Sequence, residues 1–416
     1  MSRMIILSAC LALCANSAFA ADEGLALTEQ HLQAGTLSAG QAALESHLKK
    51  NPRDDQARMG LGLLQFVRSF EGLTQAAYRH GFLQPLLRMV PESQREEFPV
   101  PINPKPERLS YKQARGIIQA FASQLAAAEA TLAKVDSDSV KLPLHFGLIR
   151  LDFDGDGKAI ESETFWRIYA RVNSLTGLTE EQVKAFVITF DAADACWLRG
   201  YCHLLMALSE SGLAYDWREL FERTGHRLFA EIDPPSPFQD EPLEGNELSW
   251  GIGMYADYIA FVHLINFDVS EPKRLESALN HLEAMIGLSR RNWELILQET
   301  DDDNEWVPSP KQTGVIPGVK VTPEMVAGWQ EFLTEANAIL KGQKLLPFWR
   351  GTGARGLNLR KVFTQPQRFD LVLWVQGTGV IPFLEEGELT DSAAWERMAA
   401  AFEGALNFVG FAFWFN

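Results

Sequence analysis

The chain has 416 residues, of which 46% are hydrophobic and 22% are charged, a balance typical of folded globular proteins and incompatible with global disorder. Its 54 acidic and 38 basic side chains give a net charge of −16. Nucleic-acid binding requires clustered Lys and Arg, and the sequence contains no such cluster, so this composition excludes a nucleic-acid partner and favours cations as ligands.

The first twenty residues predict export. Arg3 precedes an apolar run of about eleven residues, and the small-residue sequence AFA ends at Ala20. This pattern is typical of a signal peptide at residues 1–20 that is cleaved before Ala21, and it implies a periplasmic or secreted protein. A lipoprotein anchored at Cys10 is the less favoured alternative. No later stretch has the roughly 18–20 consecutive apolar residues of a membrane span, so we expect none.

Residues 21–98 have the pattern of helical hairpins. Leu44 and Leu48 repeat at helical spacing, and Asn51-Pro52 ends that helix before another begins at Asp54. The pattern therefore predicts antiparallel helices joined by short turns.

Part of this region resembles a degenerate tetratricopeptide repeat. His47 stands where that family prefers alanine, and little more than one copy is present, so a plain helical hairpin fits equally well. The resemblance implies a groove for a protein or peptide partner. The residues that carry it are Gly35, Gly40, Leu44, Pro52 and Leu61-Gly62.

A proline-rich segment, PVPINPKPERL, separates this region from a second helical region at residues 107–230. The second region opens with a long predicted helix from Tyr111 to Val135. After an acidic loop, helical periodicity returns over residues 164–173, 179–190, 195–211 and 217–229.

The acidic loop RLDFDGDGKAIESETF has the spacing of a calcium site. Asp152, Asp154 and Asp156 alternate, Gly157 permits a sharp turn, and Glu163 stands eleven residues after the first aspartate. Calcium is a hard cation that binds six to eight oxygens, and alternating carboxylates can supply several of them together. We therefore expect Ca²⁺ to bind here.

The spacing resembles the twelve-residue loop of the EF-hand family. Ala159 stands where that family has a larger apolar residue, and Pro143 weakens the entering helix, so we expect one structural ion rather than a paired calcium sensor. The implied ligands are the side chains of Asp152, Asp154, Asp156 and Glu163 and the backbone carbonyl of Lys158.

Two pairs of residues follow the loop. Asp191 and Asp194 precede a helix, where N-capping explains them, with a ligand role as the alternative. Cys196 and Cys202 lie six residues apart on that helix, which is too far for a disulfide unless the helix unwinds. We expect two thiols, with a disulfide at a bent helix left open.

A third region, residues 247–416, alternates helices with irregular segments. Helices are predicted at residues 248–267, 272–299, 323–341 and 391–406, and the glycine-rich tail favours short strands. The apolar end of the chain, NFVGFAFWFN, is expected to fill a core. The long loop 300–322 contains Asp301 and Glu305 beside Trp306, a combination that suits sugar chemistry.

These patterns predict a mainly α protein, in which a repeat-like N-terminal hairpin precedes a larger helical domain with one EF-hand-like loop and a few short strands or extended turns near the C-terminus. No GxSxG, HExxH or P-loop motif occurs, so we assign no catalytic or cofactor-binding residue. We expect an exported calcium-binding protein with a non-enzymatic binding or scaffold role. The alternative is a periplasmic polysaccharide-acting enzyme of all-α type, a glycoside hydrolase or lyase that uses the carboxylates of loop 300–322.

Overall fold

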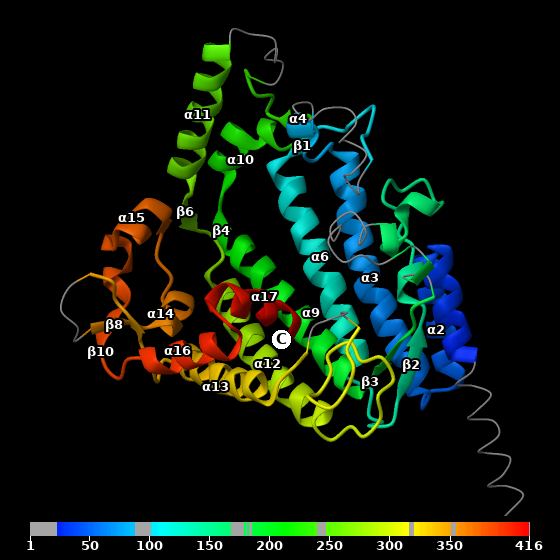
Figure 1. Ribbon diagram of the computed structural model, residues 1–416. Helices are drawn as coiled ribbons and strands as arrows, with labels where there is room; N and C mark the ends of the chain where they lie inside the picture. Colours follow the sequence, from blue (N-terminus) through cyan, green and yellow to red (C-terminus); the bar gives the residue numbers. More distant parts are fainter. Residues whose placement is uncertain are drawn as a thin grey trace, which may run out of the picture. The chain divides into compact units, whose positions relative to one another are not determined.

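The fold is mainly α with a few short strands, as the sequence predicts (Figure 1). Among the described helices, none has both the length and the apolarity that a bilayer span requires. The predicted signal peptide, its cleavage site and Cys10 lie outside the described residues. The computed structural model describes residues 23–87, 101–167, 179, 181–182, 185–238, 247–315, 320–350 and 355–415.

The chain divides into two compact units whose segments interleave along the sequence. Unit 1 comprises Met1–Gly72, Ser123–Cys202 and Leu288–Thr322, and unit 2 comprises Leu73–Ala122, His203–Gly287 and Pro323–Asn416. The regions predicted from the sequence are consecutive instead. The difference arises because four of the five boundaries between the units fall inside long helices. These are α3 (Asp55–Arg79), α6 (Tyr111–Leu132), α9 (Ala192–Ala214) and α12 (Pro272–Ile296).

Unit 1 begins with the predicted helical hairpins: residues 23–34 are helical and are followed by α2 (Leu37–Lys50) and the first part of α3. His47, the departure from the repeat pattern, is buried, and its Nε2 lies 2.7 Å from Oδ2 of Asp54. The other oxygen of Asp54 accepts a hydrogen bond from the N–H of Ala57 and so caps α3.

The remaining elements of unit 1 include a short antiparallel pair, β2 (Lys141–Leu144) and β3 (Ile188–Asp191), with Leu142 opposite Phe190. The sequence predicts helix over residues 179–190, and for its last residues this is wrong. The stretch Ile188-Thr189-Phe190 combines β-branched and aromatic side chains, and it satisfies its backbone groups by pairing with β2. Two 3₁₀ helices complete the unit, η1 (Phe146–Leu148) and η2 (Glu161–Glu163).

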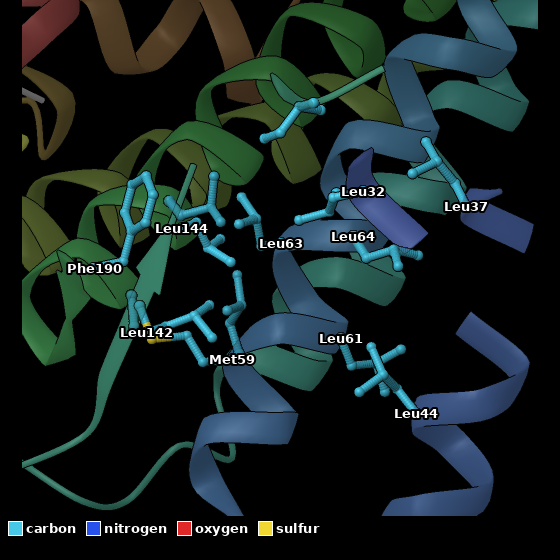
Figure 2. Close-up of a cluster of buried hydrophobic side chains, with 14 of the residues drawn as sticks. Leu32, Leu37, Leu44, Met59, Leu61, Leu63, Leu64, Leu142, Leu144 and Phe190 are labelled. Atoms are coloured by element: carbon cyan, nitrogen blue, oxygen red, sulfur yellow. The ribbon is translucent and has the colours of Figure 1, made fainter. Parts of the chain in front are cut away.

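The core of unit 1 joins α2, α3 and the β2–β3 pair. Figure 2 shows leucines of α2 and α3 together with Leu142, Leu144 and Phe190 of the two strands. Cys202 of α9 is fully buried, and both Cys196 and Cys202 are free thiols, as expected from their spacing.

Unit 2 holds short sheets among its helices. The sheet orders are β4-β6-β9, β10-β8-β7 and β1-β5, and the strands expected near the C-terminus are present. Its elements are α4 (Gln84–Leu87), β1 (Leu109–Ser110), β4 (Tyr215–Asp216), α10 (Arg218–Thr224), η3 (Gly225–Arg227), β5 (Ile232–Asp233), α11 (Glu247–Leu264), β6 (Asn266–Val269), α13 (Pro323–Leu340), β7 (Leu346–Pro347), β8 (Arg355–Leu357), α14 (Leu359–Thr364), β9 (Phe369–Asp370), α15 (Leu371–Gln376), η4 (Thr378–Phe383), β10 (Leu384–Glu386), α16 (Ser392–Ala401) and α17 (Ala405–Phe415).

The end of the chain fills a core only in part. The ring of Phe415 is fully buried and packs against Trp329 of α13 and Phe402. On the other side of α17, Leu406 and Phe413 are exposed.

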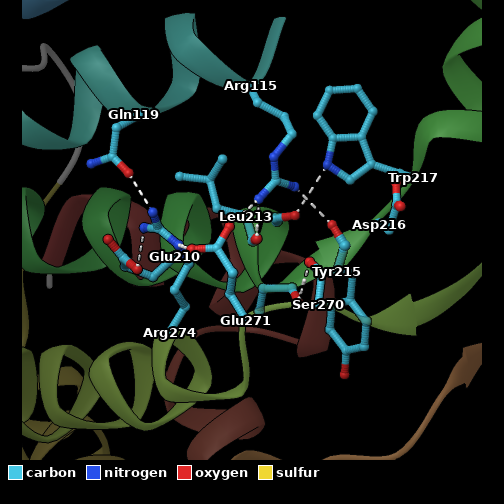
Figure 3. Close-up of polar contacts among 12 residues, drawn as sticks. Arg115, Gln119, Glu210, Leu213, Tyr215, Asp216, Trp217, Ser270, Glu271 and Arg274 are labelled. Atoms are coloured by element: carbon cyan, nitrogen blue, oxygen red, sulfur yellow. Dashed lines mark hydrogen bonds and ion pairs between the residues drawn. The ribbon is translucent and has the colours of Figure 1, made fainter. Parts of the chain in front are cut away.

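Two arginines fasten the end of α9 in unit 2 (Figure 3). The guanidinium of Arg115 donates to the carbonyl oxygens of Leu213 (2.7 Å) and Tyr215 (2.9 Å) and to Glu271. Arg274 donates to Glu271 (2.7 Å) and to Glu210 (2.8 Å). Carbonyls in the last turn of a helix lack partners within the helix, so Arg115 supplies hydrogen bonds that α9 cannot make itself.

Two helical glycines predict opposite effects of alanine. In α3, a Cβ on Gly62 would lie 2.4 Å from Cγ of Leu132, whereas a Cβ on Gly116 in α6 would meet no atom within 4 Å. Gly62→Ala should therefore lower the free energy of unfolding by about 1–3 kcal/mol through overpacking. Gly116→Ala should raise it by about 0.5–1 kcal/mol because alanine favours helix. Urea unfolding measures both, and equal stabilities of the two variants would contradict the packing described.

Candidate metal centre

The loop predicted to bind calcium is closed by backbone contacts in unit 1. Arg150 and Thr164 form an isolated antiparallel bridge, and the N–H of Leu151 donates to the carbonyl of Glu163 at 3.2 Å. The two ends of the loop, residues 152–163, therefore lie next to each other.

Three of the predicted ligands converge inside this loop. The carboxylates of Asp152, Asp154 and Asp156 each bring an oxygen within 4.8 Å of the other two. Backbone N–H groups of the loop orient them: the two oxygens of Asp152 accept from Gly155 (2.7 Å) and Gly157 (2.9 Å). The N–H of Asp156 donates to Asp154 at 3.0 Å. The loop backbone therefore holds three like charges close together.

Gly157 has the role predicted from its position. Its φ is +82°, in the left-handed region that side chains other than glycine rarely adopt, and Gly155 has a φ of +77°. These two glycines let the chain turn sharply enough for successive N–H groups to point at Asp152.

The other two predicted ligands are held differently. The carboxylate of Glu163 is buried, and its two oxygens accept hydrogen bonds from the N–H groups of Phe153 (2.9 Å) and Ile160 (2.8 Å). Burial raises the pKa of Glu163, and the negative charges of Asp154 and Asp152 add to that effect. Glu163 thus links Phe153 near the start of the loop to Ile160 near its end. The N–H of Lys158 donates to Asp156 at 2.7 Å.

The loop is anchored on the N-terminal hairpin. The N–H of Arg150 donates to the carbonyl of Leu32 at 2.9 Å. Gly35, with a φ of +64°, touches the loop so closely that a Cβ on it would lie 2.1 Å from that of Ala159. Gly35, a residue of the repeat-like pattern, must therefore be glycine because Ala159, more than a hundred residues later in the chain, leaves no room for a side chain.

Glu71 of α3 is a member of this site that sequence reasoning missed. Its side chain accepts a hydrogen bond from the N–H of Asp152 at 3.1 Å. Burial raises its pKa to about 7, and the nearby charge of Asp152 contributes. Nothing in the spacing of α3 signals this contact, because it depends on how the helix packs against the loop.

A second carboxylate cluster lies elsewhere in unit 1. Oxygens of Asp191, Glu299 and Glu305 lie within 4.8 Å of one another, and the side chains of Asp191 and Glu299 are hydrogen bonded. Asp191 also accepts from the N–H of Ala193 (2.7 Å), and Asp194 accepts from that of Asp191 (3.0 Å). The predicted capping role of the two aspartates is thus confirmed.

Burial decides the protonation of this cluster. It raises the pKa of Glu299 to about 8 and that of Glu305 to about 7, with repulsion from Asp191 as a further cause in both. The pKa of Asp194 is raised for the same two reasons. Glu299 and Glu305 therefore retain protons at a higher pH than ordinary carboxylates do, which reduces the repulsion within the cluster.

The loop residues considered for sugar chemistry are separated by the fold. Lys141 forms ion pairs with Asp301 and Asp303 and lowers the pKa of Asp301. Trp306 packs in the core, with its ring centroid 5.7 Å from that of Phe146 and 5.4 Å from that of Trp197.

The second cluster predicts a stability that falls as the pH rises. Because the folded-state pKa values of Glu299 and Glu305 lie above the ordinary value of 4.5, the folded chain retains protons that the unfolded chain has lost between about pH 5 and pH 8. The free energy of unfolding should decrease across that range by about 1–3 kcal/mol. Glu299→Gln should flatten this slope and be more stable than the unaltered chain at pH 8.

Glu294→Gln is the matched control, because Glu294 is an exposed carboxylate near the end of α12, the helix that directly precedes Glu299. In Glu294→Gln, the free energy of unfolding measured with denaturant should change with pH as steeply as in the unaltered chain. If the free energy of unfolding changes equally with pH in the unaltered chain, Glu299→Gln and Glu294→Gln, the cluster is not the source of the pH dependence.

Comparison of the chain with protein-family models, curated proteins and solved structures finds no match. The resemblances to the EF-hand loop and the tetratricopeptide repeat therefore stay predictions.

Proposed function

We propose that the chain is a calcium-binding protein in which the loop from Asp152 to Glu163 holds one structural Ca²⁺. The observation that carries this proposal is the convergence of Asp152, Asp154 and Asp156 to within 4.8 Å, with their carboxylates oriented by the loop's own N–H groups. A hard divalent cation offsets the repulsion among these charges, and oxygen is the ligand atom that calcium prefers.

The remaining ligands set the affinity. The carbonyl of Lys158 and water complete a shell of six to eight oxygens, and Glu163 can add a carboxylate whose oxygens each also accept one N–H, from Phe153 and from Ile160. Sharing its lone pairs in this way weakens the contribution of Glu163 to binding. We therefore place the site in the weak class typical of extracellular modules, with a dissociation constant of about 10⁻⁴–10⁻³ M.

A site of this affinity suits a protein outside the cytoplasm, which agrees with the signal peptide proposed at residues 1–20. The ion would stabilise the contacts of the loop with Leu32, Gly35 and Glu71, and through them the N-terminal hairpin. We propose a non-enzymatic binding or scaffold role, in which the hairpins from residue 23 to α3 contact a protein or peptide partner.

A second candidate function is cleavage of a polysaccharide. One observation favours it: Glu299 and Glu305 have raised pKa values and lie close to Asp191, as a general acid and its partner do in glycoside chemistry. The packing of Trp306 in the core and the ion pairs of Asp301 with Lys141 weaken it. The enzyme would be favoured over the scaffold if the unaltered chain cleaves a polysaccharide and Glu305→Gln loses this activity while it keeps the fold.

Calcium should stabilise the chain against heat. A ligand that binds only the folded state raises stability by about 2.7 kcal/mol at a hundred times its dissociation constant, which corresponds to a rise of roughly 3 °C in the unfolding midpoint of a chain of this length. Asp154→Asn and Glu163→Gln should each reduce or abolish the rise between chelator and calcium, because each removes a charged ligand. Differential scanning calorimetry measures the midpoints.

Glu161→Gln is the control. This carboxylate belongs to the loop, but it forms an ion pair with Arg150 and is not part of the cluster of three aspartates. It should keep the full calcium response. No response in the unaltered chain, or an equal response in Asp154→Asn, would remove the proposed site.

A further inference from the structure

Helix α11 of unit 2 exposes a row of large apolar side chains. They are between 39% and 71% exposed, although such residues on a surface helix usually face a core. Five of them lie on one side of the helix and make an apolar surface, the α11 surface, formed by Ile252, Tyr255, Tyr258, Ile259 and Val262, whereas Phe261 lies on the opposite side from Ile252.

The spacing along α11 is that of a coiled-coil seam. Ile252, Tyr255, Ile259 and Val262 follow one another at intervals of three, four and three residues, which are successive a and d positions of a heptad. The helix also has a side engaged within the unit, where Asp257 forms an ion pair with Arg227, beside α10. The seam itself carries no charge.

Helix α15 adds to this apolar surface. Strands β6 and β9 pair directly after α11 and before α15, and the N–H of Leu371 donates to the carbonyl of Ile265 at 2.9 Å, so α15 begins beside the end of α11. Its exposed apolar side chains are Val372, Leu373 and Val375.

The exposed apolar area is close to the apolar share of one side of a stable dimer interface. With about 200 Å² for a fully exposed aromatic side chain and about 100 Å² for an aliphatic one, the eight side chains of the α11 surface and α15 offer about 600 Å². A specific interface buries about 800 Å² on each partner, of which about 65% is apolar in homodimers.

We propose that α11 pairs with α11 of a second copy of this chain, and that the protein is a homodimer through this seam. A twofold axis presents the same surface on both subunits, and an uncharged a/d seam is complementary to itself. Membrane surfaces instead attract helices rich in Lys and Arg, and α11 has neither residue in a chain with a net charge of −16. The dimer is independent of the proposed calcium site.

Sedimentation equilibrium of the chain without residues 1–20 tests the dimer, between about 1 and 100 μM protein, a range that brackets the micromolar affinities of interfaces of this size. The unaltered chain should sediment as a dimer. Ile259→Lys and Ile252→Lys, at separate turns of the seam, should each weaken dimerisation at least about tenfold, because each buries an unpaired charge. Higher salt should strengthen the dimer by screening the repulsion between two acidic chains.

Leu208→Lys is the matched control, because Leu208 of α9 is 61% exposed and lies outside the seam. It should remain dimeric, and circular dichroism should show all three variants folded. A monomer at every concentration would overturn the proposal, as would equal loss of the dimer in Leu208→Lys. The seam would instead be assigned to a lipid surface by a different result. In that case the unaltered chain would stay monomeric and bind phosphatidylcholine vesicles, and Ile259→Lys would abolish this binding.

Discussion

Hydrogen bonds from the loop backbone to three aspartates are the interaction on which the candidate metal centre depends. Carboxylates within 4.8 Å of one another repel, and the N–H groups of Gly155, Gly157, Asp156 and Lys158 hold them in place. The left-handed glycines make those N–H groups available, and Glu163 fixes the width of the loop from its far side. The loop is thereby shaped for a cation before the cation binds, which lowers the entropy cost of binding.

Unit 1 accommodates acidic side chains in two different ways. Around Asp152 the carboxylates are oriented by a tight loop with exposed members, which suits a hydrated divalent ion. Around Glu299 and Glu305 they meet under burial, their pKa values rise to about 8 and about 7, and protons relieve the repulsion. The two clusters therefore differ in solvent exposure and in the number of backbone donors that orient their carboxylates.

The acidic loop and the mainly α fold could be read from the sequence because their signals are local. Twelve residues contain every predicted ligand, and helical periodicity is visible over one or two turns. Contacts between distant segments could not be read in this way. Glu71 reaches the loop from a helix about eighty residues earlier, and Glu299 reaches Asp191 across more than a hundred residues.

One further difference has the same physical origin. The end of the helix predicted over residues 179–190 became β3, because pairing with β2 outweighed a weak helical pattern. The hydrogen bonds that Glu163 accepts from the N–H groups of Phe153 and Ile160 depend on the three-dimensional closure of the loop, so the spacing of the sequence does not reveal them. Likewise, only the structure shows that the apolar side chains of α11 are exposed.

The most direct test of the central claim is a count of bound calcium ions. Titration calorimetry of the chain without residues 1–20 should give one Ca²⁺ per chain, with a dissociation constant of about 10⁻⁴–10⁻³ M. Asp156→Asn should weaken that binding at least about tenfold, since it removes one of the charges that attract the ion. No binding up to millimolar calcium, or binding that Asp156→Asn leaves unchanged, would contradict the assignment of this loop.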